Sequence, residues 1–132
     1  MATVKLVPEN TTDPRVRAVF DDIKAVKEID WVPGIWRALA NHPEHLELCW
    51  SRLKAIMKPG KLDMMTKEMI AVAVSVTNSC RYCINAHMAA AQKLGLSDEA
   101  QGEMLAVIGL YNQMNKLADA FQLEPDVKPK VD

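Results

Sequence analysis

Residues 67–91 read KEMIAVAVSVTNSCRYCINAHMAAA and hold the densest group of reactive side chains in the chain. A carboxylate, two thiols and a potential base fall within twenty residues of one another, as Glu68, Cys80, Cys83 and His87. Two cysteines separated by two residues can close a disulfide or share a metal ion, and a nearby histidine can take a thiol proton. The spacing therefore indicates thiol redox chemistry first and zinc binding second.

The first part of this stretch decides the fold class, because it fits two kinds of secondary structure. A strand pattern is carried by alternating branched residues, namely Ile70, Val72, Val74 and Val76. A strand followed by Cys-x-x-Cys and a helix would be the thioredoxin arrangement. However, the flanking segments all have helical periodicity, and the sequence has no second alternating run to pair with this one. We therefore predict a buried helix here, with Asp63 as its N-cap.

Before this stretch, caps and helix breakers predict further helices. Asp13-Pro14 starts the first, and Pro43 opens a longer one that Pro59-Gly60 stops. Cys49 falls on the apolar face of the second of these helices and is expected to be a small buried hydrophobe. A short helix is expected between the two. Most of the tryptophans, which are Trp31, Trp36 and Trp50, are expected to fill this half of the core, and the alternative is that they line an oligomer interface.

After this stretch, two more helices are expected. Ser79 is predicted to cap a helix from about Cys80 to Leu94, which Gly95 terminates. Ser97 is predicted to cap a final long helix. Its apolar stripe consists of Met104, Val107, Ile108, Tyr111, Met114, Ala118 and Phe121.

Length and composition agree with a small helical protein. The chain has 132 residues, of which 49% are apolar, and a formal charge of -1. We predict an all-α fold, a single domain over residues 1–132 with five to seven helices and a loosely ordered tail over 123–132. The sequence contains no Lys/Arg stripe of the kind that binds nucleic acid and no apolar run long enough to span a membrane. The N-terminus does not resemble a signal peptide. A cytoplasmic location is expected.

The predicted helices bring the reactive residues together. On a helix starting near Cys80, the two cysteines and His87 share one face. Cys80 would lie in the first turn, where free N–H groups and the helix dipole favour a thiolate. His87 would lie one turn beyond Cys83 and could act as its base. Glu68 can orient the imidazole if the two helices form a hairpin around Asn78-Ser79.

The pattern E-x11-C-x2-C-x3-H, formed by Glu68, Cys80, Cys83 and His87, resembles the carboxymuconolactone decarboxylase superfamily and, within it, the alkylhydroperoxidase D-like branch. The segments AHMAAAQKLGLSDEA and LYNQMNKLADAF further along the chain are also similar to that family. The likeness covers roughly residues 40–122, and its four-residue signature is more specific than a bare Cys-x-x-Cys pair.

The resemblance implies a helical fold, assembly into trimers or hexamers and reduction of hydroperoxides at the cysteine pair. Cys83 would be the peroxidatic thiol and Cys80 the resolving one, with Glu68 and His87 as proton relay. An external dithiol or a disulfide reductant protein would reduce the pair again, and neither a cofactor nor a metal is expected. The best-known peroxidases of the family have a histidine just before the second cysteine, whereas this chain has Tyr82, a poor base near neutral pH.

Several alternatives stay open at this point. The pair can belong to a disulfide reductase or a redox sensor without peroxide specificity, since nothing in the sequence identifies the oxidant. Zinc held by the four motif residues is a further alternative, as is a non-catalytic cysteine pair. The residues alone do not decide which thiol attacks first, because Cys83 has the closer base and Cys80 the better position at the helix end.

Overall fold

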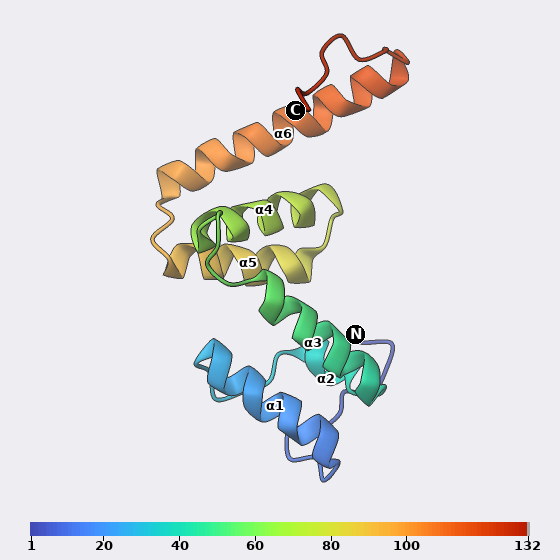
Figure 1. The fold of residues 1–132 in the computed structure, drawn as a ribbon, viewed down its shortest axis with the longest axis vertical. Helices are drawn as coiled ribbons and strands as arrows, with labels where there is room; N and C mark the ends of the chain where they lie inside the picture. Colours follow the sequence, from blue (N-terminus) through green and yellow to red (C-terminus); the bar gives the residue numbers. More distant parts are fainter. Residues whose placement is uncertain (132) are drawn as a thin grey trace. The chain divides into compact units, whose positions relative to one another are not determined.

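The computed structural model describes residues 1–131, which fold into six α-helices without any strand (Figure 1). The prediction of an all-α fold with five to seven helices is therefore confirmed. These residues divide into two compact units, one spanning Met1–Lys58 and one running from Pro59 to the end of the described chain. The single-domain organisation stays a prediction. None of the helices in residues 1–131 combines the length and the hydrophobicity needed to cross a bilayer.

The N-terminal unit holds the helices α1 (Pro14–Lys27), α2 (Gly34–Leu39) and α3 (Pro43–Ile56). Asp13 caps α1 as predicted, since its side chain accepts hydrogen bonds from the backbone N–H groups of Arg15 and Val16. The core of this unit comes mainly from α1 and α3, and it consists of Val16, Val19, Phe20, Ile23, Val32, Trp36, Ala40, Leu46 and Trp50.

The tryptophans of this unit do not all enter its core. Trp36 and Trp50 are buried and pack edge to face with ring centroids 5.2 Å apart. Trp31, in contrast, is 54% exposed and is not part of this core. It lies in the break between α1 and α2, outside the periodic apolar stripes of the helices. Cys49 is half-buried and packs against the core, close to its predicted role.

The C-terminal unit holds α4 (Met64–Thr77), α5 (Arg81–Lys93) and α6 (Asp98–Ala120). Figure 1 shows α4 and α5 side by side as a hairpin, and α6 packs against α4. Asp63 and Ser97 are the N-caps of α4 and α6, as predicted. Gly95, with φ 103°, follows the end of α5 in the left-handed conformation that glycine favours. The small core of this unit consists of Val72, Met104 and Ile108.

Burial in this unit is less complete than the predicted buried helix implies. On α4, Ile70 and Val74 are 49% and 54% exposed, so the helix is buried on one face only. On α6, the predicted stripe is buried at Met104 and Ile108 but exposed at Val107, Tyr111, Met114 and Phe121. The exposed apolar residues of α6 include Val107, Leu110, Tyr111, Met114 and Leu117. For the C-terminal part of the stripe the physical reason is length, because α6 has 23 residues and packs on α4, which has 14 and cannot cover all of it.

Candidate active site

The turn between α4 and α5 differs from the prediction that Ser79 caps α5. Ser79 has a φ of 57° and lies just past α4, and Cys80 is the N-cap instead. The Cys80 sulfur accepts a hydrogen bond from the N–H of Cys83 at 3.3 Å. The N–H groups of Ser79 and Cys80 donate to the carbonyls of Val76 (3.1 Å) and Ser75 (2.9 Å), which closes the end of α4. Cys80 therefore ends one helix and begins the next.

The two cysteines of the motif form a disulfide at the start of α5. Cys80 and Cys83 are bonded, with their Cα atoms 5.3 Å apart, and both residues are half-buried. The spacing on the first turn of a helix brings the two sulfurs within bonding reach without a long loop. The structure therefore represents the oxidised form of the pair.

Glu68 and His87 meet across the hairpin. Glu68 lies in the second turn of α4 and is 8% exposed, and its Oε2 is 2.8 Å from Nδ1 of His87 on α5. A buried carboxylate is costly unless it is hydrogen-bonded, and the imidazole supplies that bond. When Nδ1 carries the ring proton and donates a hydrogen bond to Glu68, the other ring nitrogen, Nε2, has a free lone pair and can act as a base.

All four residues predicted from the motif thus belong to the α4–α5 hairpin. The structure joins Cys80 to Cys83 and Glu68 to His87, and His87 follows Cys83 by one helical turn on α5. Their catalytic roles stay predictions. Within residues 1–131, no three His, Cys, Asp or Glu side chains converge in a way that could hold a metal ion.

The turn contains contributions that the sequence analysis missed. Ser75 is buried in α4, its hydroxyl donates to the carbonyl of Ala71 at 2.6 Å, and its own carbonyl accepts the N–H of Cys80. The left-handed conformation of Ser79 was missed as well. The signal that could have revealed a turn here is Asn78-Ser79, because both residue types favour turns.

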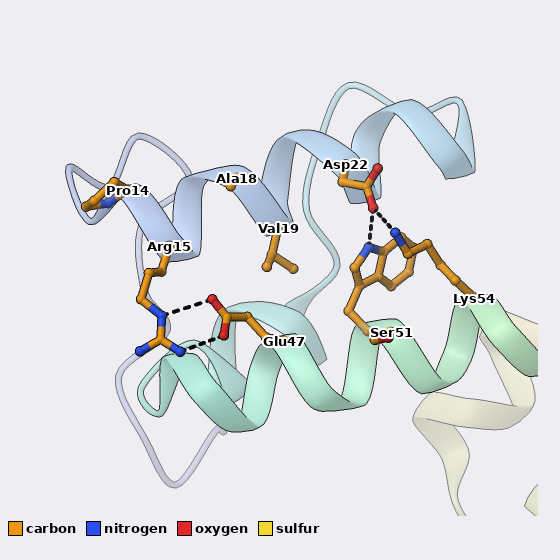
Figure 2. Close-up of a pocket in the computed structure, with 9 residues that line it drawn as sticks. Pro14, Arg15, Ala18, Val19, Asp22, Glu47, Ser51 and Lys54 are labelled. Atoms are coloured by element: carbon orange, nitrogen blue, oxygen red, sulfur yellow. Dashed lines mark hydrogen bonds and ion pairs between the residues drawn. The ribbon is translucent and has the colours of Figure 1, made fainter.

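A second feature that could hold a ligand is a groove between α1 and α3 of the N-terminal unit (Figure 2). Arg15 binds Glu47 with two hydrogen bonds of 2.9 and 2.6 Å at one end. At the other end, one carboxylate oxygen of Asp22 accepts hydrogen bonds from the Trp50 ring N–H and the Lys54 ammonium, each at 2.6 Å. Each charged residue that lines the groove is thus paired, and no thiol lines it. The α4–α5 hairpin is therefore the stronger candidate for the active site.

Fold and site together define an all-α protein whose cysteine pair begins a helix beside a buried carboxylate–imidazole contact. The chain belongs to the carboxymuconolactone decarboxylase family, whose model matches residues 43–123. This match includes the whole α4–α5 hairpin. It confirms the family resemblance that the motif carries.

Individual relatives extend this result. The structure is similar to the crystal structure of the alkylhydroperoxidase AhpD core from Rhodospirillum rubrum, with a TM-score of 0.90, 47% identity and coverage of 96% of this chain and 95% of that one. The likeness confirms the alkylhydroperoxidase D-like fold. The chain also matches "Uncharacterized protein 4 in cox locus" from Paracoccus denitrificans, at 39% identity over 46 residues. That match spans 35% of this chain and 41% of the Paracoccus protein, less than half its length.

Proposed function

We propose that the protein is a thiol-dependent peroxidase that reduces hydroperoxides through Cys80 and Cys83, with Glu68 and His87 as proton relay. The observation that carries the proposal is the 2.8 Å contact between Glu68 and His87 on the same hairpin as the Cys80–Cys83 disulfide. The similarity to a crystal structure described as an alkylhydroperoxidase core supports it. The residue roles below follow the family resemblance.

The first step oxidises Cys83. In the reduced protein, Nε2 of His87 takes the thiol proton, while Glu68 holds the imidazolium through Nδ1–H. The Cys83 thiolate then attacks one oxygen of the hydroperoxide, the O–O bond breaks, and the sulfur becomes a sulfenic acid. The alkoxide that leaves takes the proton back from His87 and departs as an alcohol.

The second step forms the disulfide that the structure contains. The Cys80 sulfur attacks the sulfenic sulfur of Cys83, and the hydroxyl group leaves as water with the thiol proton of Cys80. An external dithiol, or the dithiol of a reductant protein, then supplies two electrons and two protons and restores both thiols. In this scheme the oxidised hairpin is the form that meets the reductant.

The test is consumption of an organic hydroperoxide with dithiothreitol as reductant. Cys80→Ser and Cys83→Ser are each expected to lower turnover to the uncatalysed rate, because each removes one sulfur of the disulfide. Cys49→Ser is the matched control and is expected to keep wild-type turnover, since Cys49 packs in the other unit.

The same variants separate the alternatives. Wild-type turnover in both cysteine variants of the hairpin would reject the enzyme. Stoichiometric zinc in the purified wild type, lost in both variants, would favour a metal site instead. A wild type that reduces a model disulfide but consumes no hydroperoxide would be a disulfide reductase. The Cys80–Cys83 bond fits that function too, and Tyr82 replaces the histidine of the best-known peroxidases in the family.

We also propose that the protein self-associates into trimers or hexamers. The support comes from the exposed apolar side chains of the C-terminal unit, which include Ile70 and Val74 on α4 and Val107, Leu110, Tyr111, Met114 and Leu117 on α6. Large exposed apolar patches on small proteins often mark contact surfaces.

A further inference from the structure

Three residues other than glycine have positive φ angles in the described chain, and each ends a helix. They are Glu28 (53°), Ser79 (57°) and Gln122 (53°). At Gln122 the N–H donates to the carbonyl of Asp119, and the next N–H donates to that of Ala118. Ser79 makes the equivalent pair of bonds. The left-handed region is unfavourable for residues with a Cβ atom, so the helix-end hydrogen bonds hold the backbone there.

Ser79 differs from the other two in what comes next. After Glu28 and Gln122 the chain enters a connecting segment or the tail. After Ser79 it enters α5 directly, and the very next residue is the N-cap Cys80. The left-handed backbone at Ser79 thus immediately precedes the residue that carries one sulfur of the pair.

The position of that side chain has chemical consequences for the sulfur. The Cys80 Sγ accepts the N–H of Cys83 at 3.3 Å, and the first turn of α5 contains no acidic residue. In the reduced protein, a thiolate at this cap keeps the same N–H donor and the positive end of the helix dipole. Both stabilise the thiolate, which is the reactive form of the Cys80 side chain. A more stable thiolate also favours the reduced pair over the disulfide.

We propose that Ser79 is a positioning residue for the redox pair: its left-handed backbone holds Cys80 at the N-cap and thereby sets both the reactivity of the Cys80 thiol and the reduction potential of the disulfide. The proposal rests on the redox pair of the proposed function. It does not depend on a peroxide being the oxidant.

The test compares substitutions that differ in how well they adopt positive φ. Glycine adopts it freely, whereas valine, with its branched Cβ, strongly disfavours it. The reduction potential is measured by equilibration with glutathione. The pH dependence of Cys80 alkylation by iodoacetamide is measured in a Cys49→Ser, Cys83→Ser background, where Cys80 is the remaining thiol.

Ser79→Gly is expected to keep both readouts within about twofold of wild type, because glycine preserves the turn. Ser79→Val is expected to shift the alkylation profile to higher pH. It should also shift the thiol–disulfide equilibrium toward the disulfide by about three- to tenfold, that is, by up to about 30 mV to more negative potential. Ser79→Ala should shift both readouts in the same direction by less, and it replaces the valine variant if that variant does not fold.

Gln122→Val is the matched control, since it places the same branched residue at the same kind of helix end, away from the cysteines. It is expected to lower the melting temperature without changing the potential or the alkylation profile. Unchanged redox readouts in Ser79→Val and Ser79→Ala, or an equal change in Gln122→Val, would overturn the proposal. Neither readout uses peroxide, so a wild type without peroxidase activity would reject the proposed function and leave this test intact.

Discussion

Glu68 is the charged residue that the described part of the chain buries, and His87 supplies its partner. A carboxylate in that position strongly favours the imidazole tautomer that has its proton on Nδ1, because only an N–H group can donate a hydrogen bond to the carboxylate. The contact therefore selects the ring tautomer whose Nε2 can accept a proton. In the proposed reaction, this selection makes His87 a base for the neighbouring thiol.

Glu68→Gln tests that role with little change in volume. The amide can donate as well as accept, so it no longer fixes the tautomer or stabilises the imidazolium. We expect kcat/KM for hydroperoxide to fall on the order of 10²-fold, with a changed pH profile, as for the loss of a general acid–base group. The measurement is steady-state kinetics over a range of pH.

Glu47→Gln is the control for this change, since Glu47 is a carboxylate paired with Arg15 in the other unit. It removes the same charge and is expected to leave peroxide kinetics unchanged. A Glu68→Gln protein with wild-type kcat/KM at every pH would show that the pair is structural only.

The sequence predicted the four residues of the hairpin site because their spacing is a strong signal by itself. It did not predict the exchange of roles between Ser79 and Cys80. Serine is a common N-cap and cysteine is not, so local preference favoured Ser79. The hydrogen bonds that end α4 decide otherwise, and they depend on where α4 stops, which periodicity locates only within a residue or two.

Among the elements, α1 and α3 are joined by the Asp22 carboxylate in addition to their apolar contact. Asp22 accepts from Lys54 and from the ring N–H of Trp50. These hydrogen bonds hold the pKa of Asp22 below its ordinary value of 3.8, and the bond from Lys54 has the largest effect. A carboxyl group whose pKa is lower in the folded state stabilises the fold when it is ionised.

The stability of the protein should therefore depend on Asp22 in a defined pH range. The contribution is fully present above the unfolded pKa of about 3.8 and is lost as the pH falls through the lower, folded value. Asp22→Asn should lower the free energy of unfolding by about 0.5–1 kcal/mol at pH 7, because the pair is largely exposed, and should flatten the acid side of the pH profile.

Denaturant titrations between acidic and neutral pH measure this effect. Asp21→Asn is the control, an exposed carboxylate on the same helix. A variant at Asp22 whose stability loss is the same at pH 3 and pH 7 would contradict the assigned cause.

Helices were the most predictable elements, because caps and the 3.6-residue period act locally. Asp13, Asp63 and Ser97 cap the helices that they were expected to cap. What could not be predicted is how much of each apolar stripe is covered. The stripe on α6 shows that one face is apolar, but the contact with α4 decides which residues of that face are buried.

At the scale of the whole molecule, the exposed apolar residues of α4 and α6 lead to a prediction about assembly. Light scattering at micromolar concentration is expected to give the mass of a trimer or hexamer. Leu110→Glu, in the middle of the exposed face of α6, should weaken association by about tenfold or more, because it would bury a charge in the interface.

Gln113→Glu places the same charge at an exposed polar position of α6 and is expected to leave the mass unchanged. A monomeric wild type at that concentration would reject the proposed assembly. The family was predictable from the motif, since the relevant spacing is contained in one hairpin. The assembly stays a prediction, because one chain does not show what covers its exposed face.

The doubled role of Cys80 has a consequence for the length of the motif. Ser75 accepts the N–H of Cys80, so these two residues face each other where the hairpin closes. Glu68 lies seven residues before Ser75, and His87 lies seven residues after Cys80. Seven helical residues rise about 10 Å, so the two arms of the hairpin have equal length and their ends meet. The eleven residues between Glu68 and Cys80 thus set the position of the carboxylate along α4 so that it meets the imidazole on α5. Adding or removing one residue would separate the two groups.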